Sequence, residues 1–452
     1  MSNDPIPVKK IAVVGGGIAG LGAAWSLSRL HDVTLYDSNG RLGGHANTVE
    51  IDDNGRAVAV DTGFIVYNVR NYPNLIALFD TLGVATAESD MSFGVSLDDG
   101  RVEYSGSDLA GVFAQPRNAI SLRFWRMLRD IRRFYAAAPG YLESDAAQLT
   151  VQDLLHREAY SDAFIDDHLI PMASAIWSAS RRDIAQYPAD AFIRFFDNHG
   201  LLDLGRRPQW RTVCDGSREY VSRLVDDAVM TVRAGTPINT ITRDAGGVTL
   251  VDGTGHAERY DDVVIATHAD QALALLGDAT AAERSILGAF EYSRNTAYLH
   301  EDQRLMPRRR AAWSSWNYLQ GEQTQDTTPL CVSYWMNRLQ PLKTDRQLFV
   351  TLNPTRDPAG ILTHGRYAYE HPIFTAATSH QQEQSIALQG RQRTWFCGSY
   401  FGHGFHEDAL QSGLWVAEQL GCTRPWANVG PYTRLPHSYD KPQIQPRAAL
   451  SA

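Results

Sequence analysis

The sequence predicts an α/β fold in which a parallel sheet, assembled from separate stretches of the chain, is interrupted by a second domain. Three observations predict it. The first 44 residues follow the order strand, glycine-rich turn, helix and strand. Apolar strand patterns return at residues 261–267 and 395–398, and the long stretches between them mix strand and helix patterns.

The opening segment carries a glycine pattern suited to a dinucleotide. Residues 9–14 and 33–36 are predicted strands, and residues 21–30 a predicted helix. Gly15 allows a tight turn, Gly17 lets the backbone approach a pyrophosphate, and Gly20 lets helix and strand pack closely.

The groups around these glycines complete the prediction. Ile18 and Ala19 lie where a helix N-terminus would offer N–H groups and a positive dipole end to phosphates. Asp37, followed by Ser38, ends the second strand and is placed to accept hydrogen bonds from ribose hydroxyls. Together these features predict a Rossmann-type dinucleotide site.

A hydrophobic anchor is the alternative for residues 11–27, which carry no charge and follow Lys9 and Lys10. Four of the first ten residues of that stretch are glycine, and no small-residue cleavage pattern follows. The stretch is also shorter than the ~20 apolar residues that span a bilayer. These features disfavour the anchor. The four unpaired cysteines predict a reduced, cytoplasmic protein.

A second glycine-rich turn points to a particular dinucleotide. Arg41 can contact phosphate oxygens with a planar pair of N–H groups, and Gly43 and Gly44 follow it. This combination resembles the FAD site of the flavin-containing amine oxidase superfamily, which includes phytoene desaturase-like and protoporphyrinogen oxidase-like enzymes. Asp61 and Gly63 resemble that superfamily's next element, a strand ending in Asp-x-Gly near the flavin.

Two later segments resemble the remaining thirds of that FAD site. Around residues 215–270, the resemblance implies that the Ile238 backbone binds the adenine side and that Ala266 ends a buried strand beside the cofactor. Around residues 395–420, a strand breaks at Gly398 and a helix begins near Glu407, with Ala409 allowing close approach. Ser399 stands where the superfamily usually has an acid.

The resemblance implies a discontinuous FAD-binding domain with an inserted domain of mixed sheet and helical cap. We expect the FAD-binding domain at residues 1–70, 206–290 and 391–425, the substrate-binding domain at 71–205 and 291–390, and a C-terminal extension at 426–452. FAD is expected to be bound noncovalently, because no cysteine directly precedes His403. Covalent attachment through the nearby Cys397 is the alternative.

Composition narrows the classes of partner. The chain has 452 residues, 44% hydrophobic and 21% charged, as in ordinary globular proteins. Its net charge of −9 argues against nucleic-acid binding. Its four cysteines show no paired or zinc-type spacing. No metal site is expected, although the spacing of His403, His406 and Glu407 leaves a metal interpretation open.

Several stretches resemble a narrower bacterial family of predicted NAD/FAD-binding proteins, and the resemblance covers about residues 9–421. It rests on residues 170–178, 194–200, 313–318 and 404–408. Members are often encoded near cyclopropane-fatty-acid-synthase-like methyltransferases, which implies an acyl-lipid substrate. The favoured function is FAD-dependent hydride abstraction that desaturates an unsaturated or methyl-branched fatty acyl chain.

Two other functions stay open. One is amine oxidation, although amine oxidases of the superfamily commonly place a lysine near the flavin and the corresponding residues 292–298 contain none. The other is that of a non-catalytic flavoprotein that binds lipid or a methyltransferase. For catalysis the candidates are His403, His406 and Glu407, with His199 by analogy alone.

A basic amphipathic helix is predicted at residues 118–138, within the inserted domain. Five arginines alternate there with apolar residues in an otherwise acidic chain. Such a helix lies either in a membrane interface or against its own domain. Residues 306–310 form a second basic stretch with the same two interpretations.

Overall fold

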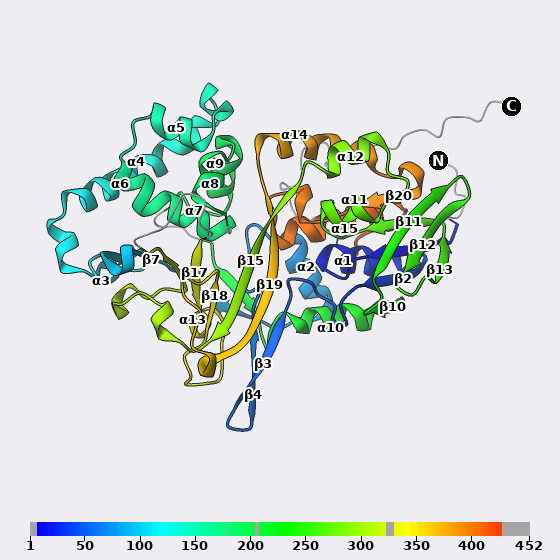
Figure 1. Ribbon diagram of the computed structural model, residues 1–452, viewed down its shortest axis with the longest axis horizontal. Coiled ribbons are helices and arrows are strands. Elements are labelled where there is room, and N and C mark those ends of the chain that lie inside the picture. The colour runs from blue at the N-terminus through cyan, green and yellow to red at the C-terminus, as the bar shows by residue number, and fades with distance from the viewer. Residues whose placement is uncertain (1–6, 178, 204–207, 322–329, 427–452) are drawn as a thin grey trace.

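The computed structural model describes residues 7–177, 179–203, 208–321 and 330–426. The predicted C-terminal extension lies outside these residues except for Trp426. Figure 1 shows a Rossmann-type part at one end, a helical part at the other, and two long strands between them.

A five-stranded parallel sheet forms the centre of the Rossmann-type part. Its order is β10 (Thr231–Ala234), β2 (Asp32–Asp37), β1 (Lys10–Val14), β14 (Asp262–Ile265) and β20 (Thr394–Phe396). Every pairing in it is parallel, and β1 and β14 are almost fully buried, as uninterrupted apolar strands require. The prediction of an α/β fold with a sheet drawn from distant stretches is confirmed.

Helices α1 (Ile18–Leu27) and α15 (His406–Gln419) pack against each other although they are distant in the sequence. Their close approach depends on a small residue, since a Cβ at Gly413 would collide with the carbonyl oxygen of Ala19. Helix α10 (Arg218–Asp227) packs beside α1, and α2 (Pro73–Leu82) beside α15. Although α2 follows the predicted boundary at residue 70, its Leu75 and Phe79 lie in the Rossmann-type core.

Further elements cover this sheet. An antiparallel sheet of β11 (Ile238–Asp244), β12 (Gly247–Asp252) and β13 (Ala257–Tyr260) shares the same core. Helices α11 (Ala269–Leu275), α12 (Ala281–Leu287) and α14 (Ala376–Gln384) lie near it (Figure 1).

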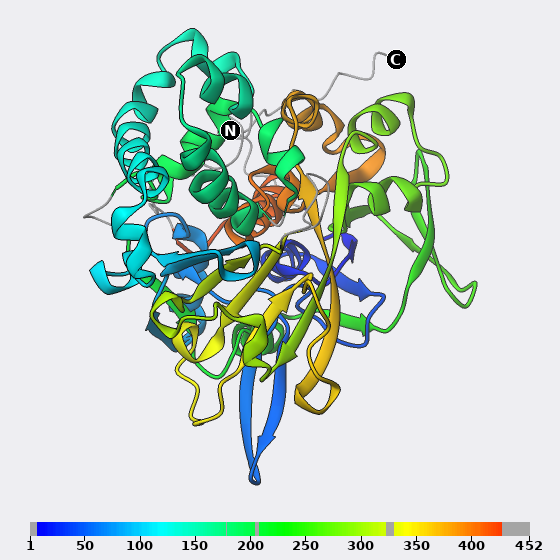
Figure 2. The ribbon, with the colours of Figure 1, turned by 60° about the vertical axis from the view of Figure 1, so that its left-hand side comes forward.

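A seven-stranded mixed sheet forms the floor of the inserted part. Its order is β19 (Thr363–Ile373), β15 (Glu291–His300), β18 (Phe349–Leu352), β17 (Cys331–Trp335), β16 (Trp316–Leu319), β7 (Phe93–Leu97) and β8 (Val102–Ser105). Strands β15 and β19 pair along their whole length and connect the two parts of the molecule (Figures 1 and 2).

Residues 109–198 form what we call the helical lobe, above that sheet in Figure 2. It contains α3 (Leu109–Val112), α4 (Leu122–Tyr141), α5 (Val151–Arg157), α6 (Asp162–Phe164), α7 (Ile170–Trp177), α8 (Arg181–Ala185) and α9 (Ala189–Asn198). A π-helical turn, Ile165–Leu169, joins α6 to α7. Aromatic side chains, among them Phe134, Phe164 and Phe196, fill its core.

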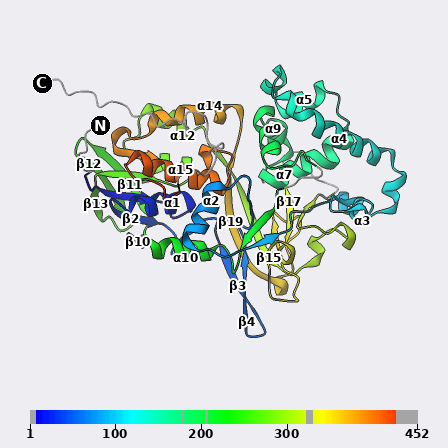
Figure 3. The ribbon, with the colours of Figure 1, turned by 180° about the vertical axis from the view of Figure 1, so that it is seen from behind.

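Short elements complete the chain. A hairpin of β3 (Thr48–Asp53) and β4 (Arg56–Asp61) projects from the molecule, as the view from behind shows (Figure 3). A small sheet joins β5 (Tyr67–Asn68), β9 (Trp210–Val213) and β6 (Thr86–Ser89), and α13 (Met336–Leu339) follows β17. Within the described ranges, none of the helices combines the length and apolar character of a bilayer-spanning segment.

Candidate functional site

One large cavity, of about 900 Å³, joins the Rossmann-type part to the inserted part. Its first group of lining residues comes from the glycine-rich turns and the ends of β2 and β14. Its second group, which we call the chamber, comes from the helical lobe, the seven-stranded sheet and residues next to them. It is mainly apolar: Met91, Ile176, Trp177, Phe195, Leu201, Trp316, Tyr334, Val350 and Leu352. The volume lies within the range of small-molecule and cofactor sites.

The two glycine-rich turns predicted from sequence lie side by side at the cavity wall. The Gly43 N–H donates to the Gly16 carbonyl at 2.8 Å, and Gly17 bridges to Gly43. Gly15 has φ +112°, and a Cβ there would lie 2.8 Å from the Ala266 carbonyl oxygen. These contacts hold both turns against the end of β14.

Helix α1 begins at this wall without a side-chain cap on its first turn. Gly17, Ile18 and Ala19 line the cavity, and a Cβ at Gly17 would meet nothing within 4 Å. The N-terminal N–H groups of the helix and the open space beside Gly17 fit a phosphate group.

Arg41 lines the cavity, but its guanidinium also holds the second turn in place. It donates to the carbonyls of Ala46 at 2.7 Å and Gly44 at 2.8 Å. Gly43 and Gly44 have positive φ angles of +107° and +57°, which favour glycine at both positions.

Asp37 lies at the end of β2 with Ser38 beside it, and both line the cavity. One carboxylate oxygen accepts the Gly16 N–H at 2.7 Å, and the other accepts the Asn39 N–H at 2.7 Å. Asp37 therefore lies beside the glycine-rich turn, as the sequence predicts. The other predicted cofactor residues that line the cavity are Gly63, Ile238, Ala266, Gly398, Ser399, His406 and Ala409.

Three predicted site residues do not line the cavity, and the first is Glu407, predicted as catalytic and cofactor-binding. Its side chain is buried, and its carboxylate accepts N–H groups from Asn74 at 2.9 and 2.7 Å and from Leu75 at 3.0 Å. Because these are the first residues of α2, Glu407 caps that helix. This corrects the prediction for Glu407.

Asp61 and Gly20 are the other two. Asp61 is buried below the cavity wall, where its carboxylate accepts the Ser217 N–H at 2.9 Å, the Ser217 hydroxyl at 2.7 Å and the Gln340 side-chain N–H at 2.8 Å. Burial raises its pKa to about 6. Gly20 lies against the Gly15 carbonyl, with no room for a Cβ. Both residues support the wall without facing the cavity. Gly20 has the close-packing role predicted for it, whereas the carboxylate of Asp61 does not line the cavity.

His406, the first residue of α15, lines the cavity with its ring stacked on Phe64 at 3.8 Å and 10° between planes. Its Nε2 lies 2.9 Å from the hydroxyl of Tyr220. Burial lowers the pKa of His406 to about 3, so its ring is neutral near pH 7. His406 thus presents a neutral imidazole to the cavity.

His403 and His199 both line the cavity, and the Phe195 ring lies near each of them although they are far apart in sequence. His199 is stacked on Phe195 at 3.8 Å, and its Nδ1–H donates to the Phe195 carbonyl at 2.8 Å. That bond leaves the lone pair on Nε2 when the ring is neutral. The Phe195 ring lies 6.4 Å from His403 and 5.0 Å from Phe405.

A third group of cavity residues has no counterpart in the sequence predictions: His45, His268, Tyr369, Glu370 and His371. The rings of His45 and His371 lie 5.4 Å apart, and burial lowers the pKa of His371 to about 4. His268 lies 3.3 Å from the Glu370 carboxylate. Three of these five are on β19, whose alternating pattern indicates only a half-buried strand.

Charge and sulfur chemistry are sparse at this cavity. Among the described residues, Arg41 is the one arginine or lysine that lines it. None of the four cysteines lines it, and Cys397 is buried elsewhere with its pKa raised by burial. In the described part of the chain, no group of three His, Cys, Asp or Glu side chains is arranged to hold a metal ion.

Comparison with known proteins identifies the architecture. Residues 13–82 match the family model of an NAD(P)-binding Rossmann-like domain. A CLA-producing fatty acid isomerase from P. acnes has a TM-score of 0.63 at 14% identity, and a putrescine oxidase 0.64 at 14%. A candidate protoporphyrinogen oxidase from Exiguobacterium sp. 255-15 has a TM-score of 0.61 at 18%. Each alignment covers 91% of this chain and 98% of the other.

The chain has an amine-oxidase-type fold. None of the curated protein sequences compared with it matches significantly. Within this fold, the one departure noted from sequence is at Ser399, which lines the cavity where an acid was expected.

Proposed function

We propose that this protein is an FAD-dependent oxidoreductase that removes two hydrogen atoms from the acyl chain of a lipid. The observation that carries the proposal is that the paired glycine turns and the apolar chamber line one and the same cavity. The fatty acid isomerase among its structural neighbours acts on an acyl chain within the same fold, which adds support.

The residues of the first group would hold FAD noncovalently. Gly17 and the start of α1 suit the pyrophosphate, and Asp37 suits the ribose. Ile238 also lines the cavity, and its backbone would contact the adenine side. FAD bound there would supply the two-electron acceptor for the reaction. The absence of cysteine from the lining supports noncovalent binding.

The chamber suits an acyl chain esterified in a lipid better than a free fatty acid. A free carboxylate buried with the chain would require a cation, and the described chamber offers none besides Arg41 at the glycine turns. The headgroup of an intact lipid can remain outside. His199 and His403 line the cavity, and one of them would take the proton that the substrate loses.

Amine oxidation is less well supported. Of the two carboxylates that line the cavity, Asp37 belongs to the glycine turns, and Glu370 lies 3.3 Å from His268 and 3.4 Å from Arg294. Strand β15 contains no lysine. A free substrate ammonium group would therefore meet a carboxylate that already contacts the Arg294 guanidinium and the His268 ring.

Anaerobic single-turnover reduction tests the proposal. Stoichiometric phospholipid with unsaturated or methyl-branched chains should bleach the flavin, and the recovered lipid should have lost two hydrogen atoms. Bleaching by putrescine but not by lipid would favour amine oxidation. Flavin that stays oxidised with both would favour a non-catalytic flavoprotein, for example a partner of a lipid-modifying methyltransferase.

A further inference from the structure

The helical lobe carries an exposed apolar patch whose residues do not line the cavity. Nine large hydrophobic side chains are exposed in the described residues, and four of them lie between residues 109 and 125. These are Leu109 (78% exposed), Ile120 (85%), Leu122 (76%) and Trp125 (49%). Isolated exposed apolar residues are common, but such a concentration on one segment is not.

These residues lie close together along the chain, on α3, on the turn before α4 and in the first turn of α4. The ring of Trp125 lies 5.9 Å from that of Phe113, and its Nε1–H donates to the Ala119 carbonyl at 2.9 Å. Leu109 precedes Phe113 by one helical turn, since the Phe113 N–H donates to the Leu109 carbonyl at 3.1 Å. We call Leu109, Phe113, Ile120, Leu122 and Trp125 the lobe patch. Helices α3 and α4 hold it at the side of the lobe away from the Rossmann-type sheet (Figure 1).

The predicted membrane-facing helix is thereby reinterpreted. The apolar stripe of α4, which includes Phe124, Met127, Ile131 and Phe134, is buried in the lobe core and cannot enter a bilayer. The surface-packed interpretation holds for that stripe. The lobe patch lies instead at the N-terminal end of α4 and on α3.

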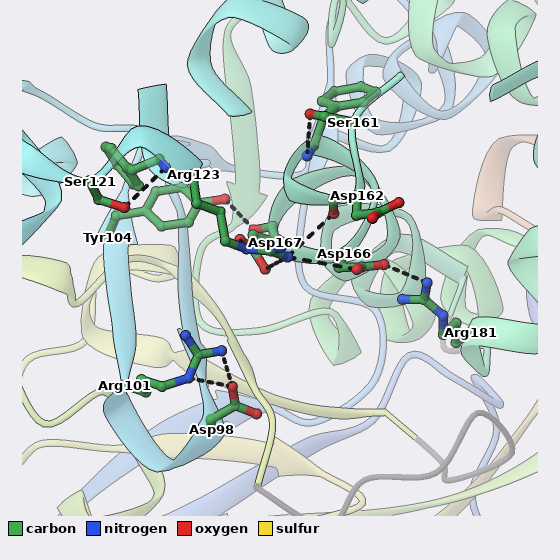
Figure 4. A network of polar contacts seen from close by, with 12 residues as sticks. Asp98, Arg101, Tyr104, Ser121, Arg123, Ser161, Asp162, Asp166, Asp167 and Arg181 are labelled. Atoms are coloured by element: carbon green, nitrogen blue, oxygen red, sulfur yellow. Dashed lines mark hydrogen bonds and ion pairs between the residues drawn. The ribbon is translucent and has the colours of Figure 1, made fainter. Parts of the chain in front are cut away.

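The arginines on α4 and on the turn before it divide into two groups, those that pair with carboxylates and those that do not. Arg123 turns toward the lobe and binds both oxygens of Asp167, at 2.7 and 3.0 Å, with Asp166 at 3.7 Å (Figure 4). Arg129 and Arg133 bind the buried Asp130. Arg123 thus fastens α4 to its lobe, whereas Arg129 and Arg133 pair within α4 with Asp130, whose other oxygen accepts the Ser161 N–H at 3.0 Å.

Arg117, Arg126 and Arg132 are exposed, and no described carboxylate forms an ion pair with any of them. Arg126 follows Trp125 directly. The exposed acid nearest in sequence to the patch is Asp108, whose carboxylate caps α3 by accepting the Gly111 N–H at 2.7 Å. A chain of net charge −9 thus presents an apolar surface flanked by unpaired positive charge.

We propose that the lobe patch docks on the surface of a bilayer that contains anionic lipid. Leucine, isoleucine and tryptophan side chains partition into the interfacial region, and nearby arginines are attracted to anionic headgroups. A second copy docked symmetrically through the same patch would bring its arginines against those of the first copy, and this like-charge repulsion argues against such a dimer. The proposal does not depend on the chemistry at the cavity.

Vesicle sedimentation tests it, with the FAD-loaded protein and vesicles of phosphatidylglycerol and phosphatidylcholine. The wild type should bind the anionic vesicles, and added salt should weaken binding. Leu122→Glu should weaken it about tenfold, and the double variant Arg126→Gln/Arg132→Gln several-fold. Ile361→Glu is the matched apolar control, since that side chain is 95% exposed outside the patch, and Arg56→Gln/Arg391→Gln is the matched charge control.

Equal binding by Leu122→Glu and wild type, or no binding by wild type, would overturn the proposal. A wild-type dimer that Leu122→Glu converts to monomer in sedimentation velocity would also overturn it. Flavin content and turnover of detergent-dispersed lipid should be unchanged in Leu122→Glu. If the protein binds vesicles but does not turn over lipid, the docking proposal is supported and the proposed reaction is rejected.

Discussion

The carboxylate of Glu407 binds Asn74 twice, through the main-chain N–H at 2.9 Å and the side-chain N–H at 2.7 Å. This buried contact ties the start of α15 to the start of α2. A negative charge at a helix N-terminus is favourable, and here it also satisfies buried donors.

Glu407→Gln should therefore lower stability and leave the chemistry intact. We expect a loss of about 1–3 kcal/mol in the free energy of unfolding, because one oxygen acceptor and the charge are removed from buried N–H groups. Denaturant unfolding measures it, with flavin content and turnover determined at low temperature. Unchanged stability with abolished turnover would restore the catalytic assignment of Glu407.

Gly17→Val should remove FAD without disturbing the fold. A Cβ at Gly17 meets nothing within 4 Å, but the side chain would project into the proposed phosphate site. The flavin absorbance of purified Gly17→Val should fall to a small fraction of that of wild type, while the circular dichroism spectrum is kept. Gly360→Val, also in open space but outside the cavity, is the control. Full flavin content in Gly17→Val would contradict the proposed site.

How far the sequence predicts this site depends on how local each signal is. The glycine turns could be predicted because their spacing alone dictates the turn and its close approaches. The sequence did not show that His406 faces the cavity and Glu407 faces α2, because the register of the helix relative to the cavity depends on packing. Successive helical residues point about 100° apart. Ala409, three residues after His406, shares its face and lines the cavity.

The chamber residues were harder to predict for a different reason. Trp316, Tyr334 and Tyr369 reach the cavity only because β16, β17 and β19 pair in one sheet. No local pattern specifies which of two faces of such a strand meets the cofactor domain. Asp61 shows the converse, since the predicted motif is present but its carboxylate binds Ser217 beneath the cavity wall.

His199→Phe should retain FAD and the stacking on Phe195 but lose the basic Nε2. If His199 accepts the substrate proton, turnover should fall about 10²–10⁴-fold, the usual range for a general base. Single-turnover flavin reduction measures it, with His403→Phe made in parallel. Wild-type rates in both variants would exclude both histidines as the base.

His406 gives a prediction about stability in acid. Its pKa is lowered to about 3 in the folded protein from an ordinary value of 6.5, so the unfolded chain takes up the proton first. The buried ring does not lower the free energy of unfolding above pH 6.5, where it is neutral in both states. As pH decreases from 6.5 toward 3, the free energy of unfolding falls. His406→Ala should remove a slope of about 1.4 kcal/mol per pH unit over that range. Unfolding free energies at pH 7.5, 6 and 5 check it, and identical slopes in both proteins would contradict it.

The same neutral ring predicts the form of the pH–rate profile. His406→Ala should keep the flavin but lose most turnover, because the stack on Phe64 and the contact with Tyr220 are lost. The remaining activity should keep the wild-type pH dependence, since His406 does not titrate near neutrality. An ionisation near pH 6.5 in wild type that disappears in His406→Ala would assign the proton transfer to His406 and contradict its neutral state.

If one cavity holds both FAD and an acyl chain, the ligands released from the purified protein should show this most directly. Denaturation of the purified protein should release FAD and an acyl lipid, identified by mass, in equal amounts. Ala297→Phe, which enlarges a buried residue of the chamber wall, should release FAD without the lipid. Release of no flavin from wild type, or equal lipid from wild type and Ala297→Phe, would contradict the account.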